Sequence, residues 1–215
     1  MILNPRFNNV SIMDRRDLVK EFAKGLILDV GCGDAVFIWG RNPPPNVVCV
    51  DIEVYRHTHV RLDANMLPFR DNSFDTVLLM EVLEHVDDVE KVLKEALRVA
   101  KEVVLVSYPF EDRELFIRNN YPRWVRDFIE DEKKEGLKET FSDEKLLEKI
   151  HTHWKDKERI LRDIEIIRKY CEKEFTLDYG LYPGWGFVCY KEKASGKAQE
   201  DFSKYLMNTF VLDTN

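Results

Sequence analysis

The chain has 215 residues, of which 44% are hydrophobic and 34% are charged, and its formal net charge is −7. This length fits one domain of ordinary size with a sizeable core. No run of about 18 apolar residues occurs, which excludes a transmembrane helix, and the acidic balance argues against a nucleic-acid partner because phosphate binding requires clustered Lys and Arg.

The first residues, 1–6, lack the long apolar segment of a secretory signal, so we expect a cytoplasmic location. The four cysteines form no CxxC pair and no zinc-type spacing. Cys49 and Cys189 lie within apolar runs and are expected to be reduced core residues, because free cysteine is usually buried.

In chain order, caps at Ser11 and Asp14 predict a first helix that runs through Phe22 and ends at Gly25. A short helix is expected at 35–39, stopped by Gly40 and the prolines at 43–45. The amphipathic period predicts a third helix at 89–100. Apolar runs predict buried strands at 26–30, 47–51, 59–62, 74–80 and 103–107.

Strands that are apolar throughout belong to a parallel sheet covered on both faces. Their alternation with helices predicts a doubly wound α/β fold. The link at 52–58 is too short for a helix.

Beyond the fifth strand, residues 111–172 read as a helical insertion with a buried stripe at Ile160, Leu161, Ile164 and Ile167. Two further strands, at 175–182 and 186–190, are expected to form a hairpin around Pro183-Gly184, which gives seven strands in all. The predicted domain spans 1–191, and 192–215 form a tail. His151 and His153 would face different sides of a helix, so no metal site is expected.

The strongest motif is Asp29-Val30-Gly31-Cys32-Gly33-Asp34-Ala35, where a strand turns into a helix. Glycines allow tight backbone bends and the close approach of a ligand, and open α/β sheets bind ligands at this edge. Asp51 stands 22 residues after Asp29, at the end of the next strand, where a carboxylate can accept hydrogen bonds from both ribose hydroxyls.

The type of nucleotide follows from the charges. The dinucleotide pattern GxGxxG needs Gly or Ala at its sixth place, where this chain has Val36. Asp29 and Asp34 would also repel a pyrophosphate. S-adenosylmethionine carries an ammonium and a sulfonium group, so acidic residues are complementary to it.

The chain resembles the class I S-adenosylmethionine-dependent methyltransferases of the broad LDVGCG group. The resemblance covers about residues 24–109. It rests on motifs in family order: residues 28–33 (LDVGCG), 50–52 (VDI), 63–64 with 67–69 and 71–75 (DA, LPF and DNSFD), 81–86 (EVLEHV) and 97–99 (LRV). It implies a Rossmann-like methyltransferase fold and S-adenosylmethionine as the cofactor.

The resemblance also implies roles for single residues. Asp29 would hold the methionine ammonium and Asp51 the ribose hydroxyls. The bend would lie against the methionine and ribose through Gly31 and Gly33, with Cys32 between them. The adenine would contact Ile52, Asp63 and the backbone of Ala64, and Glu81 would stand near the transferable methyl group.

The chain departs from the family pattern at three places. A third glycine of the loop is replaced by Ala35. The helix after the second strand is missing, which leaves that edge of the cofactor site less covered. The usual Gly-Gly turn before the fifth strand is replaced by Ala100-Lys101-Glu102.

For catalysis, His85 is the first candidate for a general base, because its unperturbed pKa of about 6.5 suits that task. A structural role for His85 remains the alternative. Glu81 and Tyr108 are further candidates. The insertion is expected to form a lid or acceptor wall.

The sequence thus predicts a methyltransferase acting on a small or medium-sized molecule by in-line displacement. Three alternatives stay open: a non-catalytic S-adenosylmethionine-binding sensor or scaffold, a methyltransferase for a protein, lipid or RNA acceptor, and, disfavoured by Val36, a nicotinamide-dependent oxidoreductase. The oligomeric state is not predicted.

Overall fold

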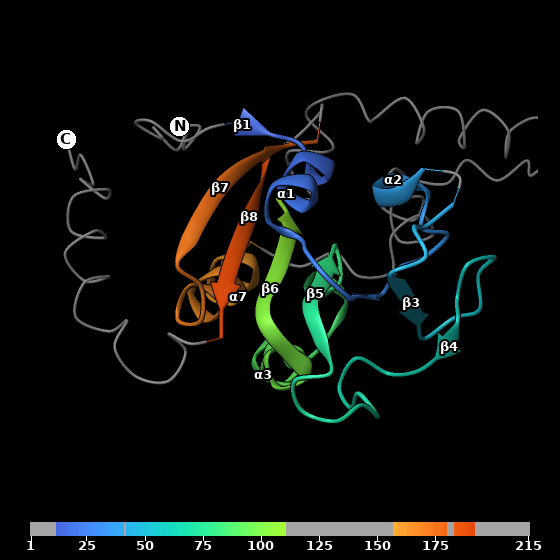
Figure 1. Cartoon of the computed structure of the whole chain (residues 1–215). Coiled ribbons are helices and arrows are strands. Elements are labelled where there is room, and N and C mark those ends of the chain that lie inside the picture. Colours follow the sequence, from blue (N-terminus) through green and yellow to red (C-terminus); the bar gives the residue numbers. More distant parts are fainter. Residues whose placement is uncertain (1–11, 41, 111–156, 180–182, 192–215) are drawn as a thin grey trace, which may run out of the picture.

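The computed structural model describes residues 12–40, 42–110, 157–179 and 183–191 (Figure 1). Its helices are α1 Arg15–Phe22, α2 Val36–Trp39, the 3-10 helix η1 Leu83–His85, α3 Val89–Val99 and α7 Lys157–Arg168. Its strands are β1 Ile12–Met13, β2 Ile27–Val30, β3 Val47–Asp51, β4 Val60–Arg61, β5 Phe74–Met80, β6 Ala100–Pro109, β7 Lys173–Asp178 and β8 Pro183–Tyr190.

The strands form one sheet in the order β1-β7-β8-β6-β5-β2-β3-β4. All pairings are parallel except those of β8, which runs antiparallel to β6 and β7. The predicted doubly wound, mostly parallel sheet is therefore confirmed, and the two-residue β1 adds an eighth strand beside β7. The strand order reverses around β2, which pairs with both β3 and β5, so the carboxyl ends of these three strands share one edge.

Two hydrophobic clusters cover the two faces of the sheet. One joins α3 and α7 to residues such as Leu28 and Val104, and the other joins α1 to residues such as Ile27 and Cys49 (Figure 1). Alternate residues of a strand face opposite sides. Asp29, two residues after Ile27, therefore lies on the α1 face of the sheet.

The first helical turns of α1 and α3 are capped by aspartate side chains. Asp14 caps α1 by accepting from the backbone N–H of Asp17 at 3.0 Å, and the helix ends at Phe22, three residues before Gly25. Asp88 caps α3 in the same way through Lys91 at 2.9 Å. The predicted link at 52–58 contains no helix, and residues 52–59 connect β3 to β4.

The β7–β8 hairpin is confirmed, but Pro183 and Gly184 belong to β8 itself and not to the turn. Gly184 lies opposite Leu177 and Pro109, and a side chain there would collide with the ring of Tyr179 and the carbonyl of Tyr108. The glycine thus serves close packing inside the sheet.

The prediction that Cys189 is a reduced core residue is wrong. The backbone N–H of Glu172 donates to the carbonyl of Val188 at 2.9 Å, which places Cys171 beside Cys189, and the two form a disulfide. Their separation of 18 residues gives no local signal of this pairing. Cys49 is buried and free, as expected.

The insertion is described only from residue 157 onward. Helix α7 buries Ile160, Ile164 and Ile167, whereas Leu161 is exposed. The hydroxyl of Tyr108 on β6 donates to Asp163 of α7 at 2.8 Å inside the core. Residues 111–156, with His151 and His153, and the tail 192–215 lie outside the described residues. None of the described helices is long and apolar enough to cross a membrane.

Candidate functional site

The glycine loop leaves the carboxyl end of β2 and is tied to the end of β3. The backbone N–H of Gly31 donates to the carbonyl of Val50, and that of Gly33 donates to Oδ2 of Asp51, both at 2.8 Å. Gly31 and Gly33 have φ angles of 69° and 53°. Because L side chains rarely adopt this left-handed region, the bend depends on glycine at both positions.

The third position of the loop is also left-handed. Ala35, which precedes α2, has a φ of 62° and is buried. An alanine in this conformation costs roughly 1–2 kcal/mol relative to the right-handed form. The local backbone explains why a glycine suits this position.

Asp29 and Asp51 are the two buried carboxylates at this edge, with exposed fractions of 2% and 9%. Asp29 accepts a hydrogen bond from Nε1 of Trp39 at 2.7 Å through Oδ2. The pKa of Asp29 is raised to about 7, mainly by burial; the Trp39 hydrogen bond lowers it, and the charge of Asp51 raises it. Asp51 accepts through Oδ1 from the N–H of Glu53 at 2.9 Å.

Cys32 lies at the centre of the bend and is half-buried. A hydrogen bond with the Cys49 thiol and burial both raise the pKa of the Cys32 thiol. The thiol is therefore neutral and adds no charge beside the two carboxylates.

The next group of predicted residues lies beside β3. The N–H of Leu62 donates to the carbonyl of Asp51 at 2.9 Å, which brings the segment of Asp63 and Ala64 next to Asp51 and Ile52. Asp63 accepts from the backbone N–H and the side-chain amide of Asn65, both at 2.8 Å, and these bonds lower its pKa.

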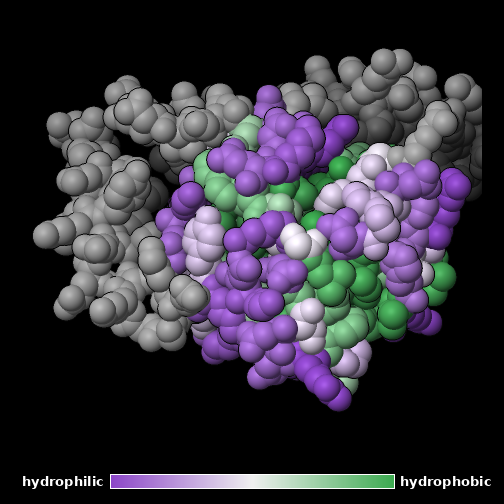
Figure 2. All heavy atoms as spheres, in the orientation of Figure 1, coloured by the Kyte–Doolittle hydropathy of each residue, from purple (hydrophilic) through white to green (hydrophobic). Residues whose placement is uncertain are grey.

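The uncovered edge predicted beside β3 is visible as well. Hydrophobic residues gather on the β3 side of the molecule in Figure 2, next to the polar surface over α1. Ile52 and Val54 are 58% and 72% exposed. No helix of the described residues covers them.

Glu81 follows β5 directly and has a left-handed φ of 58°. Its N–H donates to Oγ of Ser107 at 3.0 Å, which fixes the backbone at the strand end. Its carboxylate forms an ion pair with Arg15 at the start of α1. Strained backbone of this kind is concentrated at functional sites.

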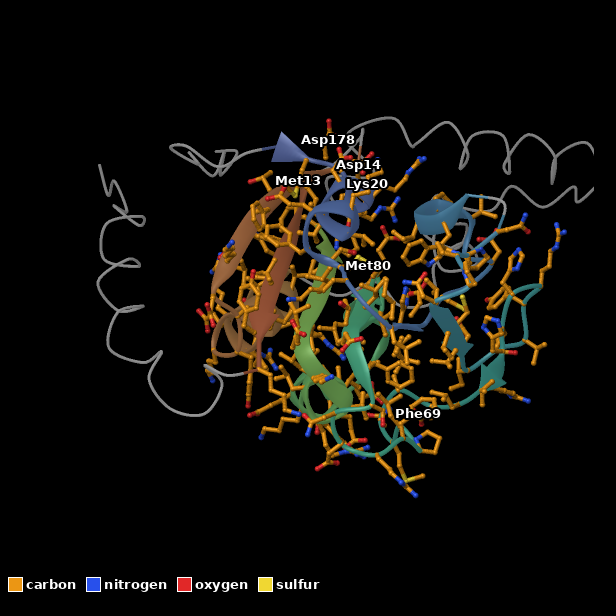
Figure 3. All side chains as sticks on the ribbon, viewed as in Figure 1. Met13, Asp14, Lys20, Phe69, Met80 and Asp178 are labelled. Atoms are coloured by element: carbon orange, nitrogen blue, oxygen red, sulfur yellow. A yellow bond between two sulfur atoms is a disulfide. The ribbon has the colours of Figure 1, made fainter. Side chains whose placement is uncertain are left out.

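Arg15 also contacts two further segments at this edge. Its guanidinium carbon lies 5.4 Å from the ring centroid of Phe37 in α2 and 4.7 Å from that of Tyr179 after β7. Figure 3 shows the start of α1 and the end of β7 at the same edge, marked by Asp14 and Asp178, with Met80 beneath α1. The result is a charged and aromatic group beside the glycine loop.

The other two catalytic candidates lie apart from this group. His85 is in η1, half-exposed, with Nε2 3.7 Å from Oε1 of Glu84. Tyr108 belongs to the core cluster on the α3 and α7 face, opposite to Asp29. Burial and the bond to Asp163 raise the pKa of Tyr108, which disfavours its ionised form.

An open groove of about 580 Å³ lies elsewhere, along α3. Its lining includes Asn65, Met66, Lys91 and Arg98, and no residue of the glycine loop. In the described part of the chain, no group of three or more His, Cys, Asp or Glu side chains could hold a metal ion.

Sequence reasoning missed Trp39, Arg15 and Tyr179. Trp39 stood within the predicted short helix, but its reach to Asp29 depends on how α2 crosses the strand end. Arg15 and Tyr179 lie outside the recognisable motifs and come together only through the sheet order. No local signal identifies them.

Residues 28–106 match the sequence profile described as a methyltransferase domain. A norajmaline N-methyltransferase of Rauvolfia serpentina is 47% identical over 49 residues, which are 21% of this chain and 17% of that protein. An uncharacterized protein of Methanocaldococcus jannaschii is 34% identical over 103 residues, 44% of each chain. The chain thus spans less than half the length of these curated relatives.

Solved structures also match the chain at low identity. A structure from work on the conversion of a disulfide bond into a thioacetal group during echinomycin biosynthesis has a TM-score of 0.50 at 14% identity, over 89% of this chain and 86% of that chain. A Thermotoga maritima protein described as a SAM-dependent methyltransferase, possible histamine N-methyltransferase, has a TM-score of 0.49 at 21% identity, over 82% and 87%.

The two loop glycines differ in their surroundings, and this gives a matched test. A methyl group at Gly31 would lie 2.5 Å from Cγ2 of Val82, whereas nothing lies within 4 Å of one at Gly33. Both alanine variants carry the left-handed penalty of roughly 1–2 kcal/mol. Gly31→Ala is expected to lower the free energy of unfolding in urea by a further 1–3 kcal/mol or so through overpacking. Equal losses would contradict a close contact with Val82.

The raised pKa of Asp29 predicts a pH-dependent stability. Its folded pKa of about 7 exceeds the unfolded value of 3.8, so the favourable contribution is complete below pH 4 and is lost as the pH rises through 7. Asp29→Asn is therefore expected to stabilise the ligand-free protein at pH 8 by up to about 4 kcal/mol, and by much less at pH 4.5. Urea unfolding at both pH values measures this. Glu53 is exposed, so Glu53→Gln is the control for removing one charge. If Asp29→Asn raised the free energy of unfolding equally at both pH values, the raised pKa of Asp29 would be refuted.

Proposed function

We propose that the chain, whose residues 28–106 match the profile of a methyltransferase domain, is a class I S-adenosylmethionine-dependent methyltransferase that binds S-adenosylmethionine and transfers its methyl group to a small or medium-sized acceptor. The observation that carries this proposal is the pair of buried strand-end carboxylates, Asp29 and Asp51, on either side of a left-handed glycine bend.

The residues present fit this cofactor. Asp29 is a buried acid whose ionisation is opposed by its surroundings, and a cationic ammonium group would offset that cost. Asp51, already aligned by the N–H groups of Gly33 and Glu53, would accept from the ribose hydroxyls. The bare backbone of Gly31 and Gly33, with Cys32 between them, lets a ligand approach closely.

The adenine would lie at the β3 edge. The exposed side chain of Ile52 offers an apolar surface for one face of the base. Asp63, held by Asn65, would accept from the adenine amino group, with the backbone of Ala64 beside it. A nicotinamide dinucleotide fits less well, because Asp29 and Asp34 would repel its pyrophosphate.

When bound, S-adenosylmethionine supplies a methyl group that its sulfonium activates. After transfer, the rest of the cofactor is a neutral thioether. The protein then has to orient the acceptor and exclude water, and orientation alone can remove several kcal/mol from a barrier. Glu81 directly follows β5, the strand next to β2, and would face the acceptor. Its ion pair with Arg15 and the rings of Phe37 and Tyr179 would form one wall of the acceptor site.

Of the candidate bases, Glu81 and His85 are accessible to an acceptor, with side-chain exposures of 32% and 42%. Tyr108 is fully buried against Asp163, which supports a structural role for its hydroxyl. Glu81 and His85 are therefore the preferred candidates for accepting the acceptor's proton. A protein, lipid or RNA acceptor and a non-catalytic binding role are the alternatives.

Calorimetry with S-adenosylhomocysteine, S-adenosylmethionine and NAD⁺ tests the cofactor. We expect heat with the first two ligands and none with the third. Asp51→Ala is expected to weaken S-adenosylhomocysteine binding about 100-fold, because charge-assisted hydrogen bonds to two hydroxyls are lost. Glu53→Gln removes the same charge nearby and should leave the dissociation constant within about twofold. No heat with either adenosyl ligand would refute the proposal.

Transfer of labelled methyl from S-adenosylmethionine to the metabolite and macromolecule fractions of a cell extract tests the activity. Once an acceptor is found, removing the general base is expected to lower kcat by about 100-fold or more. Comparing Glu81→Gln with His85→Ala then shows which of the two residues is that base. Tyr108→Phe is the control: we expect a lower midpoint of thermal unfolding at unchanged kcat. If only macromolecules take up label, the acceptor is a protein, lipid or RNA. If no fraction takes up label, the non-catalytic binding role is supported.

A further inference from the structure

We propose that Trp39 is a positioning residue that aligns the carboxylate of Asp29 for the ammonium group of the cofactor and favours its charged form. This inference rests on the proposed function. It concerns a side chain outside the glycine motif, contributed by the helix that follows the loop.

The geometry of α2 aims Trp39 at the strand end. The helix has only four residues, between the left-handed Ala35 and Gly40, which has a φ of 71°. The N–H of Trp39 donates to the carbonyl of Ala35 at 2.9 Å, and its indole Nε1 reaches Oδ2 of Asp29 at 2.7 Å. The backbone conformation on both sides of α2 therefore fixes where the indole lies.

The contact leaves half of the carboxylate for a ligand. In the part of the chain that the structure describes, Trp39 provides the side-chain hydrogen bond to Asp29, and it does so through Oδ2 alone. Oδ1 is left to accept from an ammonium group. An indole N–H is a donor only, so it orients the carboxylate without competing for its second oxygen.

The surroundings of Asp29 otherwise oppose its charge. Burial raises its pKa, and Asp51 on β3 raises it further. Around it, Cys49 on β3 and Cys32 in the loop are thiols, and Leu78 lies opposite it on β5. Trp39 thus supplies the hydrogen bond that lowers the pKa of Asp29.

The affinity for the cofactor should consequently depend on pH, and Trp39 should determine the pH at which it rises. The ammonium group is attracted to the ionised carboxylate, so affinity rises as the pH passes through about 7, and it falls again where the ligand's own amine loses its proton. Without the indole N–H, the rising limb moves to higher pH. The falling limb, which belongs to the ligand, stays in place.

Calorimetric titration of S-adenosylhomocysteine into the full chain and Trp39→Phe, from pH 6 to 8.5, tests this. We expect the variant to bind about five- to tenfold more weakly at pH 6.5 and within about twofold of the parent at pH 8.5. Asp29→Asn is expected to abolish the rising limb altogether. Trp185→Phe, which replaces another half-buried tryptophan that packs on Phe110, should change neither limb.

A second ligand separates positioning from loss of structure. 5′-Methylthioadenosine has the same nucleoside but no ammonium group, so Trp39→Phe should leave its dissociation constant unchanged at every pH. Equal weakening of both ligands, or weakening of S-adenosylhomocysteine by one factor at all pH values, would overturn the inference. Absence of S-adenosylhomocysteine binding by the parent protein would instead refute the proposed function.

Discussion

A carboxylate buried at the end of a central strand is the constraint on which the site depends. Asp29 lies on β2, between β3 and β5, where its main chain is fully committed to the sheet and its side chain is removed from water. Such a group is costly unless it is paired or hydrogen-bonded. Much of the surrounding architecture, from the left-handed loop to the four-residue α2, can be understood as the means of holding one polar side chain in that place.

The sequence predicts most of the sheet because each strand is set by a local run of apolar residues. The bounds of β3 and β5 coincide with those predicted, and α3 differs by one residue. Strand β6 starts earlier than predicted, since Ala100 pairs with Phe74 across the sheet. The register of Gly184 and the Cys171–Cys189 bond were not predictable locally, because each depends on which distant strands become neighbours.

The candidate site divides in the same way. The nucleotide-binding half of the site could be predicted from sequence motifs, because the loop glycines and Asp51 are close in sequence and lie at the ends of predicted strands. The other half could not, because Arg15, Phe37 and Tyr179 come from three separate segments around Glu81. Tyr108 shows the reverse: its place just past the predicted strand suggested reactivity, but the period-two alternation of β6 turns it toward α7.

The link between β3 and β4 carries a consequence for how a nucleoside would be held. With Ile52 and Val54 largely in solvent and no helix of the described residues over them, the base would rest against one apolar surface with its outer edge open. Substituents on that edge would meet water and not protein. The pocket would then discriminate through the sugar and the amino acid, and it would accept donors whose purine is enlarged.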